Sequence, residues 1–259
     1  MITVDGVSKR FGKTAALSNV SLDIRPGERL ALIGASGSGK STLIRTLAGL
    51  VVADGGGCIK FGDDVLQSNG AVSASSRRIR SQIGIVFQQF NLVRRSSVLK
   101  NVLIGRLGHV PVWRGTLGLF TRDEKRRAML ALAEVGIAEQ AQKRASDLSG
   151  GQQQWVAIAR CLVQETKVIL ADEPIASLDP KSAKRVMDTL TELNSRYGMT
   201  VVVSLHQIDY ATAYFPRVVA LRDGLVVYDG PSSKLTKDFL TELYGAAADE
   251  LISIGSVEP

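Results

Sequence analysis

The feature that most constrains the fold is a glycine-rich segment between an apolar run and a run with helical periodicity. Residues 34–42, GASGSGKST, fit the pattern Gly-x4-Gly-Lys-Ser. The preceding ERLALIG is typical of a buried strand, and the following STLIRTLAGL has Leu and Ile at helical spacing. Backbone amides of such a loop, with the helix dipole behind them, bind phosphate oxygens. The pattern predicts that Lys40 meets the β- and γ-phosphates of a nucleotide and that the Ser41 hydroxyl binds Mg²⁺; an ordinary glycine turn is the alternative.

A second apolar run ends in two carboxylates. In KVILADEP, residues 167–174, Asp172 and Glu173 follow four apolar residues. An open α/β sheet places its ligand chemistry outside the carboxyl ends of its strands. Asp172 is therefore predicted to hold Mg²⁺ through a water, and Glu173 to polarise the water that attacks the γ-phosphate. The alternative is a pair of solvated carboxylates.

The segment LSGGQ, residues 148–152, is a weak motif alone because Ser-Gly-Gly is common in linkers. Here QQWVAIARCLV follows with helical spacing, so the glycines are expected at a helix start, where their N–H groups can meet an anion. A second phosphate contact so far along the chain has no obvious partner in its own subunit. Across a dimer interface, the phosphate bound by a second subunit would be that partner.

With these segments, the chain resembles the ATP-binding subunits of ABC transporters over nearly its whole length. The resemblance implies an α/β fold: a P-loop NTPase core with a mixed sheet flanked by helices, an antiparallel N-terminal β part and an inserted all-α subdomain. It implies ATP and Mg²⁺ as ligands. The implied nucleotide contacts are Phe11, Gly34, Ala35, Ser36, Gly37, Ser38, Gly39, Lys40, Ser41, Thr42, Ser149, Gly150, Gly151, Gln152 and Asp179.

The resemblance also assigns roles to single residues. Phe11 matches the ring that stacks on adenine, and Asp179, in SLDP, matches a residue that reaches across the dimer. His206 matches the switch histidine at the γ-phosphate. Gln88 matches the glutamine that senses Mg²⁺ and water, and residues 88–99 match a groove for a permease helix. A structural histidine, a surface glutamine and a core phenylalanine are the alternatives.

Longer stretches, including FQQFNLVRRSSVLKNVLIGRLG and the segment from Trp113 to Phe120, resemble the ATPase subunit of phosphonate importers. The implied partners are a second copy of the chain, integral membrane permease subunits and, indirectly, a periplasmic solute-binding protein. The implied place is the cytoplasmic face of the inner membrane. Import of another small solute stays open, because the ATPase does not touch the cargo.

Composition agrees with one nucleotide-binding unit rather than a tandem pair. The 259 residues, 45% of them apolar, can bury a full α/β core, and no stretch reaches the roughly eighteen apolar residues of a membrane span. Cys58 and Cys161 lack metal-ligand spacing and are expected to be reduced thiols. The net charge of +7 is spread along the chain, which favours solvated faces over a nucleic-acid partner.

The chain is expected to form one domain over residues 1–259. Strand-like segments and the phosphate-loop helix occupy residues 1–84, an inserted helical subdomain 85–164, and alternating strands and helices follow from 167, with a hairpin turn at Gly224. Residues 68–78 are predicted to be a mobile polar surface loop, and 245–259 a loosely ordered tail.

One residue departs from the family pattern. Trp155 stands where the family commonly has an arginine after the LSGGQ motif. An arginine brings a fixed charge and five donors, whereas tryptophan brings one N–H and a large apolar face. The change is either neutral on a partly exposed helix or weakens an interaction near the composite site.

Two other classes of protein share part of this pattern. A soluble ABC protein acting on nucleic acid would use the same ATP clamp, usually with two cassettes or a long coiled-coil insertion, and this chain has neither. A P-loop kinase or GTPase would leave LSGGQ, SLDP and His206 unexplained.

Overall fold

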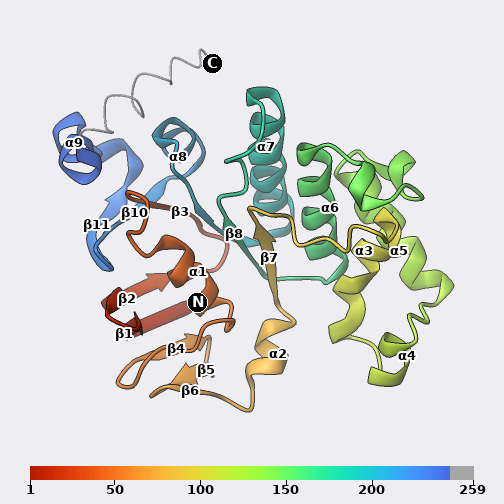
Figure 1. The fold of residues 1–259 in the computed structure, drawn as a ribbon, viewed down its shortest axis with the longest axis horizontal. Coiled ribbons are helices and arrows are strands. Elements are labelled where there is room, and N and C mark those ends of the chain that lie inside the picture. The colour runs from red at the N-terminus through yellow and green to blue at the C-terminus, as the bar shows by residue number, and fades with distance from the viewer. Residues whose placement is uncertain (246–259) are drawn as a thin grey trace.

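The structure is a computed structural model that describes residues 1–245. It has two β-sheets on one side and a lobe of helices on the other (Figure 1). The predicted loose tail, residues 245–259, lies outside the described residues except for Gly245.

An antiparallel sheet forms the N-terminal part, as predicted. Its strand order is β2-β1-β4-β5-β6, and β1 pairs with both β2 and β4. Its strands are β1 (Ile2–Phe11), β2 (Thr14–Ile24), β4 (Cys58–Phe61), β5 (Asp64–Ser68) and β6 (Ala71–Val72).

A mixed sheet forms the centre of the molecule. Its order is β11-β10-β3-β9-β8-β7, in which all neighbours are parallel except the β10–β11 hairpin. Gly224 takes φ 77° in the turn of that hairpin, as predicted. The strands are β3 (Arg29–Ile33), β7 (Ile83–Phe87), β8 (Val168–Asp172), β9 (Thr200–Ser204), β10 (Arg217–Arg222) and β11 (Leu225–Pro231).

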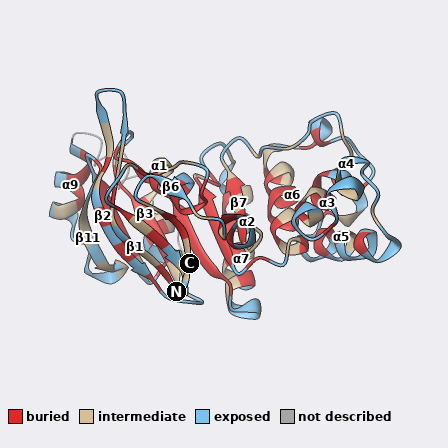
Figure 2. Cartoon of the chain, turned by 90° about the horizontal axis from the view of Figure 1, so that it is seen from below, coloured by how far each residue is buried: buried red, intermediate tan, exposed pale blue. Residues whose placement is uncertain are grey.

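The central strands are buried on both faces (Figure 2). Successive side chains of a strand point to opposite faces, so alternate residues of β3 enter different cores. Ala31 and Ile33 pack in the core with the helical lobe, whereas Leu30 and Leu32 pack in the core with the antiparallel sheet. This two-sided burial explains why the strands read as continuous apolar runs.

The helical lobe lies between β7 and β8 along the chain. The predicted boundary at residue 85 is wrong, because β7 continues to Phe87 and the first helix of the lobe begins at Val98. The lobe contains α3 (Val98–Leu103), α4 (Val112–Thr116), α5 (Arg122–Glu134) and α6 (Gly150–Val163), with short 3-10 helices at Ile104–Gly108, Ala138–Gln140 and Ala145–Asp147.

The expectation of a loop over residues 68–78 is also wrong. The segment contains β6, and α2 begins at Ser76, whose side chain is buried. The remaining helices are α1 (Lys40–Leu47), α2 (Ser76–Arg80), α7 (Pro180–Tyr197), α8 (Ile208–Tyr214), α9 (Lys237–Tyr244) and a 3-10 turn at Ser232–Lys234. Among residues 1–245 no helix has the length and apolar character needed to cross a bilayer.

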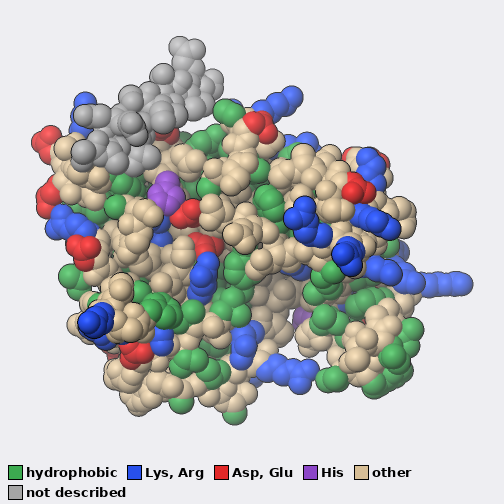
Figure 3. Space-filling view, viewed as in Figure 1, with side chains coloured by type: hydrophobic (Ala, Val, Ile, Leu, Met, Phe, Trp, Pro, Cys, Tyr) green, Lys and Arg blue, Asp and Glu red, His purple; other side chains and the backbone are tan. Residues whose placement is uncertain are grey.

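Charged side chains are mixed on the surface. On the face drawn in Figure 3, Lys and Arg are spread over both the sheets and the helical lobe and lie among acidic residues. This distribution agrees with the scattered charge of the sequence.

Candidate functional site: a phosphate loop and its carboxylates

Strand order brings the predicted segments to one edge of the central sheet. The neighbouring parallel strands β3, β9, β8 and β7 lead into the phosphate loop, His206, Glu173 and Gln88, respectively. Parallel strands end on the same side, so these segments leave the sheet together.

The phosphate loop needs its glycines for backbone conformation and for space. Gly34, Gly37 and Gly39 take φ values of 142°, 80° and 106°. A Cβ at Gly34 would collide with the carbonyl oxygen of Leu221, and one at Gly39 with that of Ala16. The loop is therefore built from positions that other residues would strain.

Lys40, the first residue of α1, is buried and points back into the loop. Its Nζ donates to the carbonyl oxygens of Gly34 at 2.6 Å and Ala35 at 3.0 Å. Burial lowers the pKa of the Lys40 ammonium, and the charges of Glu173 and Asp172 act against that shift. A buried cation held by two neutral carbonyls is suited to receive an anion.

Asp172 lies buried at the end of β8. Its Oδ1 accepts a hydrogen bond of 3.0 Å from the Ser204 hydroxyl, and its Oδ2 lies 3.5 Å from the guanidinium of Arg45. Ser204 directly faces Asp172 in the register of β8 and β9. The carboxylate therefore has a fixed orientation at the sheet edge.

Glu173 and His206 are in direct contact. His206 Nε2 lies 2.6 Å from Glu173 Oε1, and the Glu173 N–H donates to Ser204 Oγ at 2.9 Å. Glu173 has φ 49°, an unusual conformation for this residue type. Ser204 thus ties both acidic residues to β9, and His206 holds the side chain of the second.

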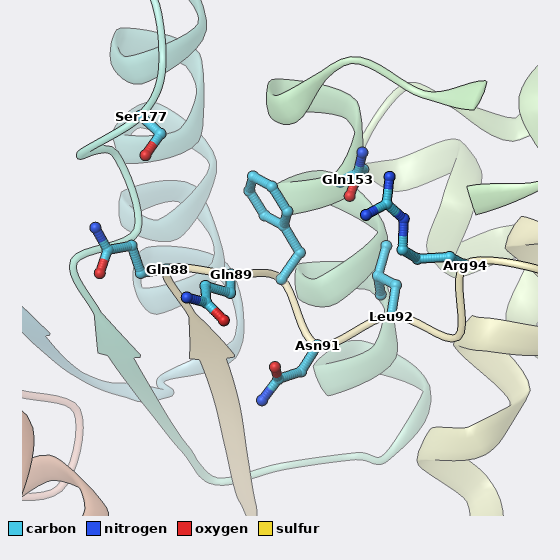
Figure 4. A pocket seen from close by; sticks show the side chains of 8 residues that line it. Gln88, Gln89, Asn91, Leu92, Arg94, Gln153 and Ser177 are labelled. Carbon is cyan, nitrogen blue, oxygen red and sulfur yellow. The ribbon is translucent and has the colours of Figure 1, made fainter. Parts of the chain in front are cut away.

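Gln88 is exposed beyond the end of β7, where it lines two pockets. A pocket of about 230 Å³ joins Gln88 to Asp172 and Arg45. A larger one, of about 640 Å³, has Gln88 and Ser177 on one side and Gln153 and Arg94 on the other (Figure 4). Its remaining lining residues are Gln89, Phe90, Asn91 and Leu92.

The LSGGQ segment starts α6, as predicted. Ser149 caps the helix: its hydroxyl accepts from the Gln152 N–H at 3.3 Å, and Gln152 Oε1 accepts from the Ser149 N–H at 3.0 Å. Gly150 and Gly151 bring α6 close to α7 and the segment before it, since a Cβ on Gly150 would lie 3.3 Å from Leu178 Cδ2 and one on Gly151 would lie 3.0 Å from Ser182 Oγ.

The structure does not bring this segment to the phosphate loop of its own chain. In both Figure 1 and Figure 2, β7 lies between α1 and α6. Among the hydrogen bonds of residues 1–245, none joins 149–152 to 34–42. Asp179 is likewise exposed and caps α7 by accepting from the Ser182 N–H at 3.0 Å. Hydrogen bonding from the Ser182 hydroxyl and from its backbone N–H lowers the pKa of Asp179.

Phe11 ends β1 with its ring 53% exposed, and the Lys9 ammonium lies 5.6 Å from the ring centroid. The ring is therefore available to a planar ligand and is not part of the core.

Trp155 is buried, with 8% of its surface exposed, so the expectation of a partly exposed position is wrong. The guanidinium of Arg185, on α7, lies 4.1 Å from the ring centroid of Trp155. This cation–π contact links the helix that begins with LSGGQ to the helix that begins after Asp179.

Sequence reasoning missed two residues of the site. Ser204 hydrogen-bonds to Asp172 and Glu173, and Arg45 faces Asp172 from α1. Ser204 ends the run TVVVS, which forms β9. A polar residue at the end of a predicted strand, like Asp172 at the end of its own, could have indicated that Ser204 belongs to the site. Arg45 carried no such signal because its role depends on how α1 packs.

The donors fit a nucleotide with its magnesium ion. Ser38 Oγ, in the phosphate loop, is buried without a hydrogen-bond partner in residues 1–245. No cluster of three or more His, Cys, Asp or Glu in that part of the chain could hold a metal alone. Mg²⁺ typically takes one or two carboxylates together with substrate phosphates, and Ser41, Asp172 and Gln88 match that sparse set.

Comparison with known proteins agrees with this geometry. Residues 17–176 match the family model described as ABC transporter. The chain belongs to the ABC transporter family, and its P-loop NTPase fold with mixed sheet and flanking helices is the one predicted.

Individual relatives are more specific. The chain is 57% identical to "Phosphonates import ATP-binding protein PhnC 2" of Pseudomonas syringae pv. syringae over 98% of this chain and 92% of that protein. It is 55% identical to "Phosphonates import ATP-binding protein PhnC 1" of Nostoc sp., over 99% and 97%. A solved dimeric bacterial ABC transporter cassette aligns with TM-score 0.78 at 34% identity, covering 90% of this chain and 99% of that one.

Proposed function

We propose that this chain is the ATP-hydrolysing subunit that powers import of a small solute, a phosphonate, across the cytoplasmic membrane. The observation that carries the ATPase assignment is the meeting of Lys40, Asp172 and the Glu173–His206 pair at the ends of adjacent parallel strands. The assignment of a phosphonate as the cargo rests on the names of the relatives.

The phosphate loop binds the nucleotide in this proposal. The loop of residues 34–42 surrounds the phosphates, with the backbone amides after Gly34 turned toward them, and Lys40 exchanges its bonds to Gly34 and Ala35 for phosphate oxygens. Phe11 stacks on the adenine. Ser41, Asp172 and Gln88 hold Mg²⁺, which neutralises charge on the phosphates when it is bound.

Glu173 is the base in this proposal. It accepts a proton from the attacking water, and His206, hydrogen-bonded to Glu173 Oε1, fixes the direction of the carboxylate and contacts the γ-phosphate. Ser204 holds the backbone of Glu173 in its left-handed conformation.

Two copies complete the site. Ser149, Gly150, Gly151, Gln152 and Asp179 lie away from their own phosphate loop, so we place them at the nucleotide held by a second copy. The homodimer binds permease subunits on the cytoplasmic face of the membrane, and the periplasmic binding protein acts through them. No nucleic acid takes part.

The test is reconstitution in lipid vesicles with its permease subunits and the cognate binding protein. A small alkylphosphonate should stimulate ATP hydrolysis, and orthophosphate or an amino acid at the same concentration should not. Stimulation by one of those solutes would reassign the cargo to another importer class. Co-purification with nucleic acid instead of a permease would contradict the transport assignment.

A further inference from the structure

A tyrosine near the C-terminal end of the described chain touches the phosphate loop. The Gly34 N–H donates a hydrogen bond of 2.9 Å to the hydroxyl oxygen of Tyr244. Both residues are buried, and 210 positions separate them in the sequence. Tyr244 is the last residue of α9, a helix that the site described above does not use.

The helix is anchored in the residues just before this contact. Leu240 and Leu243 are buried in the same core as Ile33, the last residue of β3 before the loop. Glu242 forms an ion pair of 2.9 Å with Arg222 at the end of β10. Burial raises the pKa of Tyr244 to about 12, so the hydroxyl stays neutral at physiological pH.

The contact acts on the most constrained residue of the loop. Gly34 has φ 142°, and its carbonyl oxygen accepts from the Lys40 ammonium at 2.6 Å. Tyr244 thus holds the amide on one side of Gly34 while Lys40 holds the carbonyl on the other. The two bonds together fix the direction of the loop backbone and of the ammonium.

We propose that Tyr244 is a positioning residue for nucleotide binding, acting through the Gly34 amide to hold the phosphate loop in its binding conformation. Without the hydroxyl, a buried N–H loses its partner, and the peptide turns to find another. The loop backbone and Lys40 at its end then lose the arrangement that places them around the phosphates. The C-terminal helix is therefore part of the nucleotide site, although it contacts no phosphate.

The test is Tyr244→Phe, which keeps the ring and removes the hydroxyl. Tyr228→Phe is the matched control: Tyr228 packs on Phe239 of the same helix, and its hydroxyl bonds only locally, to Pro231 O at 2.7 Å. We expect Tyr244→Phe to raise the ATP dissociation constant by about fivefold or more, consistent with loss of one buried hydrogen bond. Its kcat at saturating ATP and ATP binding by Tyr228→Phe should stay within twofold of the parent, on the same principle.

Because this role presupposes the nucleotide site proposed above, Lys40→Ala belongs in the same titration. If Lys40→Ala binds ATP like the parent, the proposed site itself is wrong. If Lys40→Ala loses binding while folded Tyr244→Phe keeps parental affinity, Tyr244 is only a packing residue and the role proposed for it is overturned.

A measurement on the parent chain covers the case in which Tyr244→Phe does not fold. Hydrogen exchange of the Gly34 amide, without nucleotide, should be as slow as that of the amides in β3. Exchange as fast as at the exposed loop residues Ser36 and Gly37 would overturn the proposal.

Discussion

At the scale of residues, the proposed chemistry depends on the pairing of Glu173 with His206. The short contact between His206 Nε2 and Glu173 Oε1 places a proton donor on the carboxylate and leaves its other oxygen for a water. Glu173, the residue after β8, is thus oriented by His206, which lies in the loop after the neighbouring strand β9.

Replacing Glu173 with Gln tests the base. The amide keeps the shape and an oxygen for His206 but cannot take a proton, so we expect ATP hydrolysis to fall by about two to four orders of magnitude. ATP binding should persist in equilibrium titration. Glu192→Gln, on an exposed position of α7, is the control and should hydrolyse ATP like the parent. Near-parental turnover by Glu173→Gln would remove this residue from the role.

The residues that could be predicted from sequence are those with a local motif. Gly34, Lys40, Asp172 and Glu173 stand in short patterns whose chemistry is set by spacing. Arg45 and Tyr244 could not be found this way, because they act through tertiary packing from α1 and α9.

At the scale of elements, α6 and α7 connect the LSGGQ segment to the part of the chain that carries the carboxylates of Asp172 and Glu173. Trp155 and Arg185 stack between the two helices, and Gly151 lies close to Ser182 of α7. The tryptophan that replaces the family's arginine is therefore part of a specific contact.

A double-mutant cycle measures that contact. Trp155→Leu, Arg185→Met and the combination should show a coupling of about 0.5–2 kcal/mol in the free energy of unfolding, typical of a cation–π pair that is partly desolvated. Additive effects in urea denaturation would show that the stack contributes nothing. Trp155→Arg, the family's residue, should destabilise more than Trp155→Leu because it sets two guanidinium groups together.

The segment after β7 is the second functional element. Phe90 and Asn91 have φ values of 59° and 46°, and Arg160 of α6 donates to the Asn91 carbonyl at 2.9 Å. Two successive left-handed residues are strained, so this segment is held in place by the helix beside it. Within residues 88–99, the range expected to form a permease groove, Phe90 and Leu92 line the larger pocket, whereas Val93 is exposed outside it.

We expect Phe90→Ala to separate transport from basal hydrolysis. The isolated subunit should hydrolyse ATP within a few-fold of the parent, because Phe90 contacts none of the site carboxylates. In the reconstituted complex, stimulation by substrate-loaded binding protein should be lost. Leu130→Asp, an exposed apolar position on α5, is the control and should keep stimulation. Intact stimulation in Phe90→Ala would place the permease groove elsewhere.

Element prediction worked where periodicity was strong and failed at boundaries. The runs VILAD and TVVVS became β8 and β9, and the helical pattern after Asp179 became α7. Residues 68–78 were predicted to be a loop because the segment is polar and rich in Ser, yet backbone pairing with β5 makes β6. The hairpin turns at Asn69 and Gly70, which have φ values of 50° and 76°, so the local signal was an Asn-Gly turn between two short strands.

At the scale of the whole molecule, the site is divided between two places on one chain. The phosphate loop with its carboxylates lies at the edge of the central sheet, and Ser149 begins α6 on the far side of β7. In the proposed head-to-tail pair of chains, Ser149 of one chain meets the nucleotide of the other. The solved structures that align with this chain include dimeric cassettes.

The most direct test of a nucleotide site shared between two chains is ATP hydrolysis by a mixture of two inactive variants. Lys40→Ala removes the phosphate-loop cation, and Ser149→Arg blocks the segment that completes the partner's site. Each variant alone should be inactive as a dimer, whereas a mixed dimer contains one intact site, made of Lys40 from one chain and Ser149 from the other. The account predicts that mixing restores ATP hydrolysis; a mixture as inactive as either variant, under conditions where mixed dimers are shown to form, would contradict it.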